Sequence, residues 1–221
     1  MSSHPKVDLK LDWCSYEAAK WAVEHWHYSR RMPAGKTVKV GVWEEGKFIG
    51  AVIFSFGANN HIGIPYGLKQ VEVCELARVA LSQHLTPVSR IISIAIRLLK
   101  RQSSGLRLVV SYADPEHNHI GAIYQAAGWV YNGNSQTQCE LLRPDGTILH
   151  KRSANALYGT IRGLPKSKEL WKYKYLYPLD SAMRAQIAPL AKPYPKRGPG
   201  ETANAPETNR ETGGSTPTGP L

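Results

Sequence analysis

Hydrophobic and polar positions change their period several times along this chain. Apolar residues at helical spacing predict one helix over residues 15–24, capped by Ser15, and another from Thr86 through residue 101, with Thr86 as cap and Pro87 first in the helix. Shorter helical patterns cover residues 118–127 and 180–190. Extended apolar runs predict strands at residues 39–43, 48–56, 71–81, 106–112, 129–131, 138–142, 147–151 and 171–179. This order predicts a mixed α/β fold, with helices on both faces of a central sheet.

The stretch at residues 106–133 is the most informative part of this pattern. A buried strand ends at Asp114-Pro115, a helix carrying Tyr124 follows, and Gly128 stops that helix. Open α/β sheets bind ligands at the carboxyl ends of their strands, so Asp114 and Tyr124 are candidate site residues. The structural alternatives are that Asp114 is only a turn residue and that Tyr124 is a core residue at helical spacing.

Length and composition are typical of a globular domain. Of 221 residues, 42% are hydrophobic and 20% are charged, and no apolar run approaches the roughly 20 residues that span a bilayer. We expect an N-terminal extension at residues 1–12, one domain at residues 13–197 and a disordered tail at residues 198–221, which is rich in Pro, Gly, Thr and Asn. The three scattered cysteines suggest neither a disulfide framework nor a zinc site, so a reducing cytosol is the expected setting.

The net charge of the chain indicates a class of binding partner. The chain carries 28 Lys and Arg against 17 Asp and Glu, a net of +11, of which the tail from residue 191 contributes only +1. Such a basic domain favours a polyanion, most simply nucleic acid, although surface solvation or a CoA-like phosphate would also use this charge. Candidate DNA contacts lie in the segment HWHYSRR, where Tyr28 offers a stacking surface and Arg30 and Arg31 offer phosphate ligands.

Two further features bear on binding. Tyr66 lies in a long loop rich in turn formers and is a candidate for stacking on a base, with a packed loop aromatic as the alternative. Arg30 and Arg31 have an alternative too, as the surface end of the preceding helix. His25 and His27 are separated by two positions, so they diverge on a helix, and no metal site is expected.

Five motifs resemble, in the same order, those of the Mom family of phage DNA-modification proteins. They are HYSRRMP at 27–33, ELAR at 75–78, SYADP at 111–115, GAIYQAAGW at 121–129 and KYLYPL at 174–179. The YQAAGW step is also similar to the last conserved motif of the GNAT acyltransferases. The resemblance implies a divergent GNAT-like acyltransferase fold. It also implies conversion of adenine in double-stranded DNA to N6-(carbamoylmethyl)adenine, in the host cytoplasm, as a protection against restriction.

The resemblance marks His27, Arg78, Asp114 and Tyr124 as active-site residues. Adenine N6 is a poor nucleophile, so we expect Asp114 to accept its proton or hydrogen bond and Tyr124 to act as donor. Arg78 could hold a carboxylate, a phosphate or the DNA backbone. The target base must leave the duplex, at a cost of a few kcal/mol.

The sequence is compatible with more than one donor of the group that is transferred to adenine. GNAT enzymes cradle CoA phosphates on a glycine-rich loop, whereas residues 82–87 read SQHLTP and contain no glycine. Transfer of an acyl group would leave an amide at N6, whereas the implied product carries an N6–CH2 bond. Either acyl-CoA or a glycine-derived donor is compatible with the sequence. A conventional GNAT acetyltransferase and a basic DNA-binding protein without activity are the alternative functions.

Overall fold

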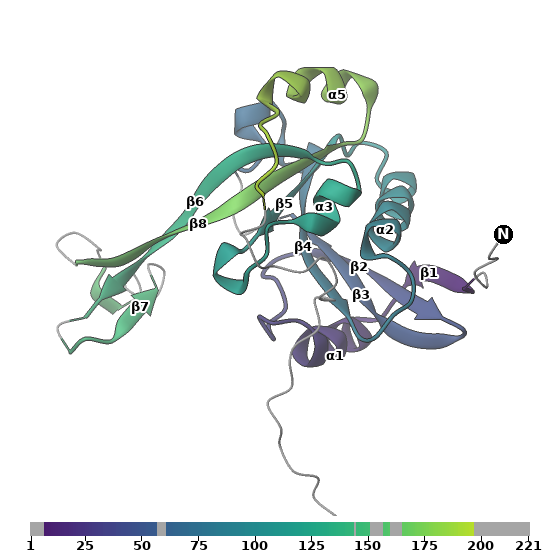
Figure 1. The fold of residues 1–221 in the computed structure, drawn as a ribbon, viewed down its shortest axis with the longest axis horizontal. Coiled ribbons are helices and arrows are strands. Elements are labelled where there is room, and N and C mark those ends of the chain that lie inside the picture. The colour runs from purple at the N-terminus through teal and green to yellow at the C-terminus, as the bar shows by residue number, and fades with distance from the viewer. Residues whose placement is uncertain (1–6, 57–60, 144, 151–156, 160–164, 197–221) are drawn as a thin grey trace, which may run out of the picture. The chain divides into compact units, whose positions relative to one another are not determined.

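The computed structural model describes residues 7–56, 61–143, 145–150, 157–159 and 165–196 (Figure 1). These residues form two compact units. The first unit comprises the described residues up to 56 and residues 76–103, and the second comprises residues 61–75 and the described residues from 104 to 196. The tail predicted at residues 198–221 lies outside the described residues.

The first unit is built on strands in the order β1-β2-β3-β4. β1 spans Leu9–Trp13, β2 spans Thr37–Glu44, β3 spans Lys47–Ser55, and β4 spans Val73–Leu81, whose first three residues belong to the second unit. β1–β2 and β2–β3 are antiparallel. The predicted hairpin is confirmed, and its turn residues Glu45 and Gly46 both have positive φ, as a two-residue turn of this kind requires. β1 starts within residues 1–12, which the sequence pattern alone set apart as an extension.

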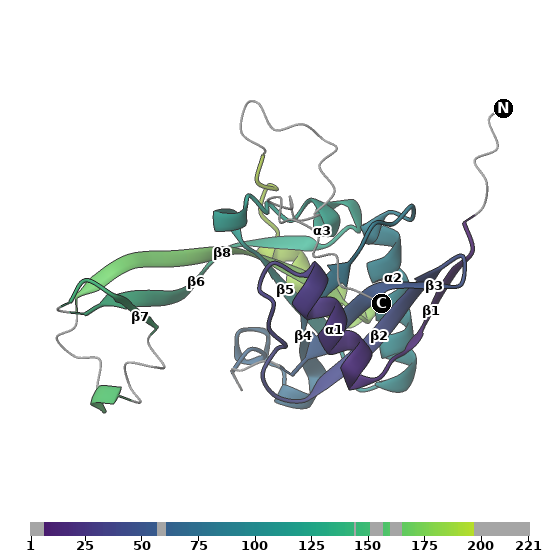
Figure 2. The same cartoon turned by 90° about the horizontal axis from the view of Figure 1, so that it is seen from below.

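Two helices cover this part of the sheet. α1, Tyr16–Trp26, begins at the predicted cap, where Ser15 Oγ accepts from the N–H of Ala18. Its Ala19, Ala22 and Val23 pack on Ala51, Ile53 and Ala80. α2, Val88–Gln102, lies on the other face and contacts β1 and β2 (Figure 2). Pro87 rather than Thr86 is the cap of α2, so the predicted start was wrong by one residue. A mixed α/β architecture is thus confirmed.

The second unit carries four strands in the order β5-β8-β6-β7, each antiparallel to its neighbour. Their bounds are Leu108–Ala113 for β5, Val130–Leu142 for β6, Ile148–His150 for β7 and Lys166–Pro178 for β8. Short helices connect or cover them: η1 at Ile64–Tyr66, η2 at Gln70–Glu72, η3 at Pro115–His117, α3 at Ala122–Ala126, α5 at Ser181–Ile187 and η4 at Ala188–Leu190. The core combines Leu108, Val110, Leu176, Met183 and Ile187, all fully buried.

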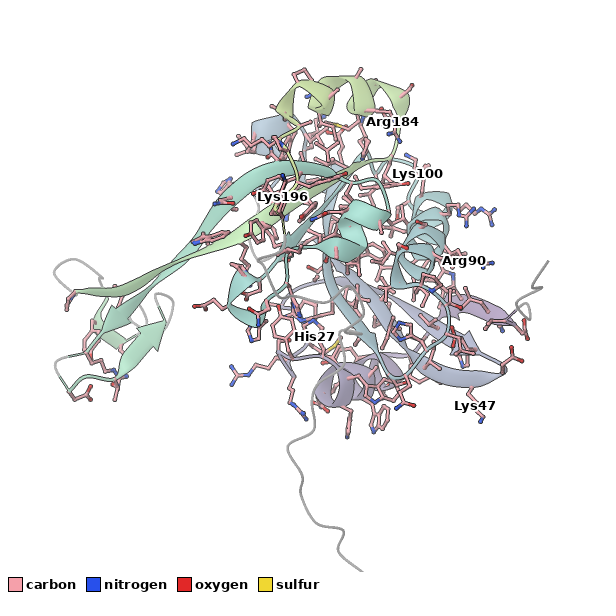
Figure 3. All side chains as sticks on the ribbon, in the orientation of Figure 1. His27, Lys47, Arg90, Lys100, Arg184 and Lys196 are labelled. Atoms are coloured by element: carbon pink, nitrogen blue, oxygen red, sulfur yellow. The ribbon has the colours of Figure 1, made fainter. Side chains whose placement is uncertain are left out.

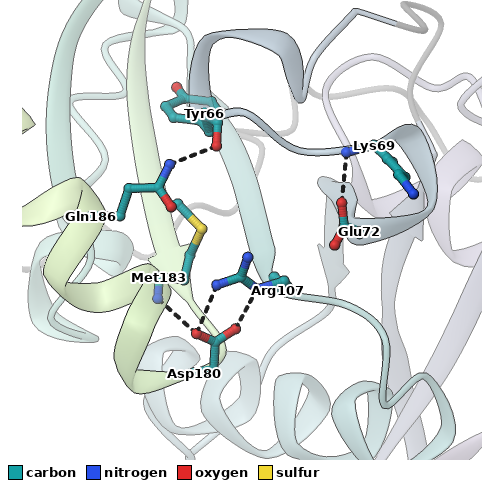
Figure 4. A network of polar contacts seen from close by, with 7 residues as sticks. All are labelled: Tyr66, Lys69, Glu72, Arg107, Asp180, Met183 and Gln186. Carbon is teal, nitrogen blue, oxygen red and sulfur yellow. Dashed lines mark hydrogen bonds and ion pairs between the residues drawn. The ribbon is translucent and has the colours of Figure 1, made fainter.

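A network of polar contacts fixes α5 within this unit (Figure 4). The Asp180 carboxylate accepts from the N–H of Met183, which caps the helix as predicted, and from Nε and one terminal nitrogen of Arg107 at 2.9 and 3.2 Å. Gln186 donates to the carbonyl of Tyr66 at 2.7 Å. These bonds hold α5 against the loop that carries Tyr66.

The β6–β8 ribbon is longer than the sheet that supports it. β5 pairs only with residues 173–178 of β8, whereas β6 and β8 remain paired as far as Leu141 and Lys166. Three irregularities interrupt their register. The far part of the ribbon extends away from the body of the second unit and ends beside β7 (Figure 1).

Among the described residues, no helix is long and apolar enough to cross a membrane.

Candidate functional site

Asp114 follows the last residue of β5, at the strand end where the sequence placed it. Its side chain is 11% exposed, and one oxygen lies 3.1 Å from the ammonium of Lys172 on β8. Its other oxygen accepts from the N–H of Glu116 at 3.1 Å, which caps η3. His117 Nδ1 lies 3.5 Å from the same oxygen that contacts Lys172. Asp114 therefore has the turn role that the sequence allowed, together with a charged partner.

These contacts decide the protonation state of Asp114. Burial by itself would raise the pKa of this carboxyl. The charge and hydrogen bond of Lys172, the N–H of Glu116 and the charge of His117 outweigh it, so the pKa is lowered. Asp114 is an anion at neutral pH. It can hold a cationic or N–H-bearing group firmly, but it is a weaker base than a carboxylate of ordinary pKa.

Tyr124 lies in α3 and is 7% exposed. Its hydroxyl oxygen is 2.7 Å from Oγ of Ser111, which is fully buried on β5. Its ring contacts Trp129 and Tyr175 at centroid distances of 5.0 and 5.1 Å. Tyr124 thus packs in the core, which was the alternative that the sequence left open, while its hydroxyl reaches the same strand that ends at Asp114.

A glycine brings α3 this close to β8. Gly121 has φ +78°, and a Cβ at this position would lie 2.3 Å from a ring atom of Tyr175. Tyr175 donates from its hydroxyl to the carbonyl of Ile120 and accepts from Gln125 at 3.1 Å. The position and conformation of Gly121 therefore set the height of Tyr124 above the sheet.

His27 ends α1 in the first unit and is 8% exposed. Its Nδ1 accepts from the N–H of Ser29 at 3.1 Å and lies 2.9 Å from Ser29 Oγ. A ring nitrogen that accepts from a backbone N–H carries no proton, so the neutral imidazole has its proton on Nε2. The ring of Tyr28 stacks on this imidazole at 4.3 Å. Figure 3 labels His27, which lies just beyond α1.

Arg78 lies on β4 and contacts the same loop. Its Nε donates to the carbonyl of Arg31 at 3.2 Å, and the Oγ of Ser29 lies 3.4 Å from that carbonyl. A terminal nitrogen of Arg78 donates to the carbonyl of Ala77 at 2.6 Å. The structure therefore brings His27 and Arg78 together through Ser29 and Arg31. The guanidinium keeps further N–H donors for an anionic group.

The predicted DNA contacts differ in their surroundings. Tyr28, Arg30 and Arg31 are all exposed. Arg30, with φ +47°, donates from its guanidinium to the carbonyl of Glu24 at 3.2 Å, so it also closes the end of α1. Tyr66 is 4% exposed, belongs to the core of the second unit, and donates to Asn132 at 3.2 Å. Its role as a base-stacking residue stays a prediction, but the packed-loop alternative describes its position here.

The loop before α2 bears on the donor. The carboxylate of Glu44, 6% exposed, accepts from the N–H groups of Leu85 and Thr86 at 2.8 and 2.7 Å. Burial raises the pKa of Glu44, but bonds from Thr86 and Leu85 and the charge of His84 lower it more. An internal anion thus takes the backbone donors that a phosphate would need here, and Pro87 offers none. The described residues of this loop do not fit a CoA pyrophosphate.

No group of three or more His, Cys, Asp and Glu side chains within the described ranges could hold a metal ion. Sequence inspection missed three residues that shape the sites: Lys172, Ser111 and Glu44. A serine within an apolar strand was the visible sign of Ser111. The partnerships of Lys172 and Glu44 join positions 58 and 41 or 42 residues apart, which no local pattern reveals.

Comparison with known proteins identifies a family and a relative to which this chain is similar. A model described as the Mom protein family matches residues 8–196. The methylcarbamoylase Mom of Escherichia phage Mu is 25% identical over 205 residues, which cover 86% of this chain and 84% of that protein.

Solved structures give a looser likeness. An N-acyl amino acid synthase from uncultured soil microbes, FeeM, is 11% identical with a TM-score of 0.47, covering 83% of this chain and 97% of that one. A spermidine/spermine N-acetyltransferase of Vibrio cholerae is 11% identical with a TM-score of 0.42, covering 80% and 96%.

Proposed function

Because the chain belongs to the Mom protein family, whose model spans residues 8–196, we propose that it is a DNA-modifying transferase. Its reaction is the conversion of adenine in double-stranded DNA to N6-(carbamoylmethyl)adenine, which protects the DNA from restriction. The observation that carries the proposal is the family match, because it includes all four candidate catalytic residues. The curated relative of phage Mu, a methylcarbamoylase, supports the same type of transfer.

The geometry of Asp114 supports a defined part in this reaction. As N6 attacks the CH2 carbon of the donor, the bond from that carbon to the donor's leaving group breaks and the leaving group departs with the electron pair. The nitrogen thereby gains positive charge and its remaining protons become acidic. A carboxylate of lowered pKa is too weak to deprotonate a neutral amine, but it can hold the N6–H and take the proton once the charge has developed. Asp114 therefore orients the amine first and accepts the proton late.

The other candidates take complementary roles. Tyr124 donates a hydrogen bond from its hydroxyl, which Ser111 positions. Arg78, anchored on the Arg31 carbonyl, holds an anionic group of the donor or of the DNA. His27 carries its proton on Nε2, because Nδ1 accepts from the N–H of Ser29. The target adenine is flipped out of the duplex, and Tyr28, exposed beside His27, offers a stacking surface.

Glu44 favours a donor that is not anchored by a pyrophosphate at α2. This weakens the case for a conventional GNAT acetyltransferase using CoA in the usual way. A small donor, such as a glycine derivative whose CH2 carbon carries a group that leaves as N6 attacks, agrees better with the N6–CH2 linkage.

The test is mass spectrometry of nucleosides from plasmid DNA after expression of the full chain in a bacterium. We expect a modified adenine heavier by one carbamoylmethyl group, together with resistance of the plasmid to restriction enzymes that cut at adenine-containing sites. The Asp114→Asn variant, expressed at the same level, serves as control. An unmodified adenine profile in several hosts would count against the transferase and leave a DNA-binding protein as the alternative.

A further inference from the structure

One face of α2 carries a row of three exposed arginines, Arg90, Arg97 and Arg101. At about 100° per residue, Arg97 and Arg101 leave the helix axis within about 20° of the direction of Arg90. The buried residues of α2 lie on the opposite side of the helix, which contacts β1 and β2; they are Ile91, Ile92, Ala95, Ile96 and Leu99. The arginine row therefore points away from the sheet, and Figure 3 labels its first member, Arg90.

No charge of opposite sign balances the arginine row within α2. This helix contains four basic residues, Arg90, Arg97, Lys100 and Arg101, and no acidic residue. Within the described part of the chain, none of the three arginines of the row forms an ion pair. A helix face that is only solvated is typically laced with charges of both signs. The arginine row instead forms a surface of one sign.

The placement of these charges does not favour the helix itself. Arg90 lies in the first turn, which holds no acidic residue, and there the helix dipole favours negative charge. Arg97 and Arg101 are four positions apart, so their like charges repel each other along the helix face. Helix stability therefore does not explain the row, whereas a bound polyanion would offset both effects.

The chemistry and spacing of the arginine row suit the phosphates of duplex DNA. A guanidinium binds a phosphate through two parallel N–H bonds. Arg90 and Arg97 are about 10 Å apart along the helix axis, and Arg101 extends the row to about 16 Å. Phosphates border a minor groove about 6 Å wide and a major groove about 12 Å wide. The row is thus long enough to reach phosphates on both sides of a groove.

We propose that the arginine row of α2 binds the phosphate backbone of duplex DNA across a groove, without reading the base sequence. The inference deepens the proposed function and rests on it for the choice of DNA over other polyanions. The surface itself is argued from the exposure, alignment and unbalanced charge of the row, all within the first unit. It does not depend on the roles of Asp114 and Tyr124.

The experiment compares two double variants of the full chain that each remove two positive charges. Arg90→Gln with Arg97→Gln changes the row and leaves Arg101, whose charge in the last turn suits the helix dipole. Lys47→Gln with Arg184→Gln changes exposed residues of β3 and α5, both labelled in Figure 3. Affinity for a duplex of about 30 base pairs, roughly three helical turns, is measured without any donor over a series of salt concentrations. Thermal melting checks that the variants are folded.

The α2 variant should bind several-fold more weakly, and its plot of log K against log salt should flatten by ~1.8, which is two phosphate contacts at ~0.9 each. Its melting temperature should not fall, because Arg90 and Arg97 form no ion pair with any described residue. The Lys47 and Arg184 variant should keep a slope close to that of the wild type. Arg90→Lys with Arg97→Lys retains both charges and should retain the slope.

Three results would overturn the proposal. A wild-type slope in the folded α2 variant would leave the row as a solvated helix face. Equal flattening in the Lys47 and Arg184 variant would mean that net charge alone explains both losses. A flattened slope in the variant with lysines at positions 90 and 97 would show that the loss does not follow the charge of the row.

The outcome separates this inference from the proposed function. A wild-type chain that binds duplex through the arginine row but yields no modified adenine would refute the transferase and leave the surface standing. A chain that modifies adenine while the α2 variant binds duplex like the wild type would refute the surface alone.

Discussion

The ammonium of Lys172 lies 3.1 Å from a carboxylate oxygen of Asp114, and it joins the middle of β8 to the end of β5. Its charge is the principal influence that holds the pKa of Asp114 below its ordinary value against the effect of burial. The Asp114 side chain is only 11% exposed, so solvent screens this pair weakly. The pair ties the ionisation of the candidate catalytic group to a residue of β8.

Removing this charge should shift the pH dependence of the reaction. Activity requires the Asp114 carboxylate, so it falls as pH drops through the pKa of Asp114. Lys172→Gln raises that pKa, and the acidic limb of the rate profile should move to higher pH. The measurement is the initial rate of adenine modification of purified DNA between about pH 3 and pH 8, a range that includes the ordinary carboxyl pKa.

Lys174→Gln is the matched control, because Lys174 lies on the same strand over the ring of Tyr66, and within the described part of the chain it forms no ion pair with Asp114. It should leave the acidic limb in place. Asp114→Asn should lower the rate by ~10²–10⁴-fold at every pH, as expected for the loss of a general acid–base group. A wild-type acidic limb in Lys172→Gln would remove the lysine from the control of Asp114.

The bond between Tyr124 and Ser111 allows the role of the tyrosine to be separated from its packing. Tyr124→Phe and Ser111→Ala each remove the same 2.7 Å contact, and each should cost about 1 kcal/mol of unfolding free energy. Only Tyr124→Phe removes the hydroxyl that we expect to donate to the substrate. It should therefore lose ~10²-fold or more in rate, whereas Ser111→Ala should lose far less.

Denaturant melts and nucleoside mass spectrometry on both variants decide the matter. Equal stability losses with unequal rates would support the hydroxyl as a catalytic donor. Equal losses of both stability and rate would make Tyr124 a structural residue, in keeping with its 7% exposure.

The sequence predicted those features that depend on residues close together along the chain, and missed those that depend on residues far apart. The cap at Ser15, the turn at Glu45-Gly46 and the cap at Asp180 depend on residues within four positions, and all three were predicted. Strand β1 was missed because a five-residue edge strand shows its role only when paired with β2. The pairs Asp114–Lys172 and Glu44–Thr86 depend on the tertiary fold, which brings distant segments together, so no periodicity could reveal them.

The two arginines of the loop after α1 should differ in their contribution to stability. Arg31 is exposed, and we expect it to contact a phosphate, so Arg31→Ala should flatten the salt dependence of log K by ~0.9. Arg30 donates to the carbonyl of Glu24, so Arg30→Ala should also loosen the end of α1 and lower the melting temperature. Duplex affinity over a salt series, together with a melt of each variant, tests this. A slope unchanged in Arg31→Ala would place that residue outside the DNA footprint.

The stability of the first unit should depend on the charge of Glu44. Hydrogen bonds from Leu85 and Thr86 help to lower the pKa of this carboxyl below its unfolded value. A group with a depressed folded pKa stabilises the protein above the unfolded pKa, and this contribution is lost as pH falls through the folded pKa. Glu44→Gln keeps the shape and removes the charge, so it should cost about 2 kcal/mol near pH 7, the range for hydrogen bonds to a charged group.

The difference between wild type and Glu44→Gln should therefore be full at neutral pH and should shrink below about pH 4, close to the ordinary glutamate value. Urea unfolding at a series of pH values measures it. Glu24→Gln is the control, because Glu24 is exposed and pairs only with Lys20 at 3.7 Å among the ion pairs of α1, so its effect should stay small at every pH. A Glu44→Gln difference that did not change with pH would show that the charge of Glu44 does not stabilise the loop before α2. The internal carboxylate would then no longer explain why that loop lacks free donors for a phosphate.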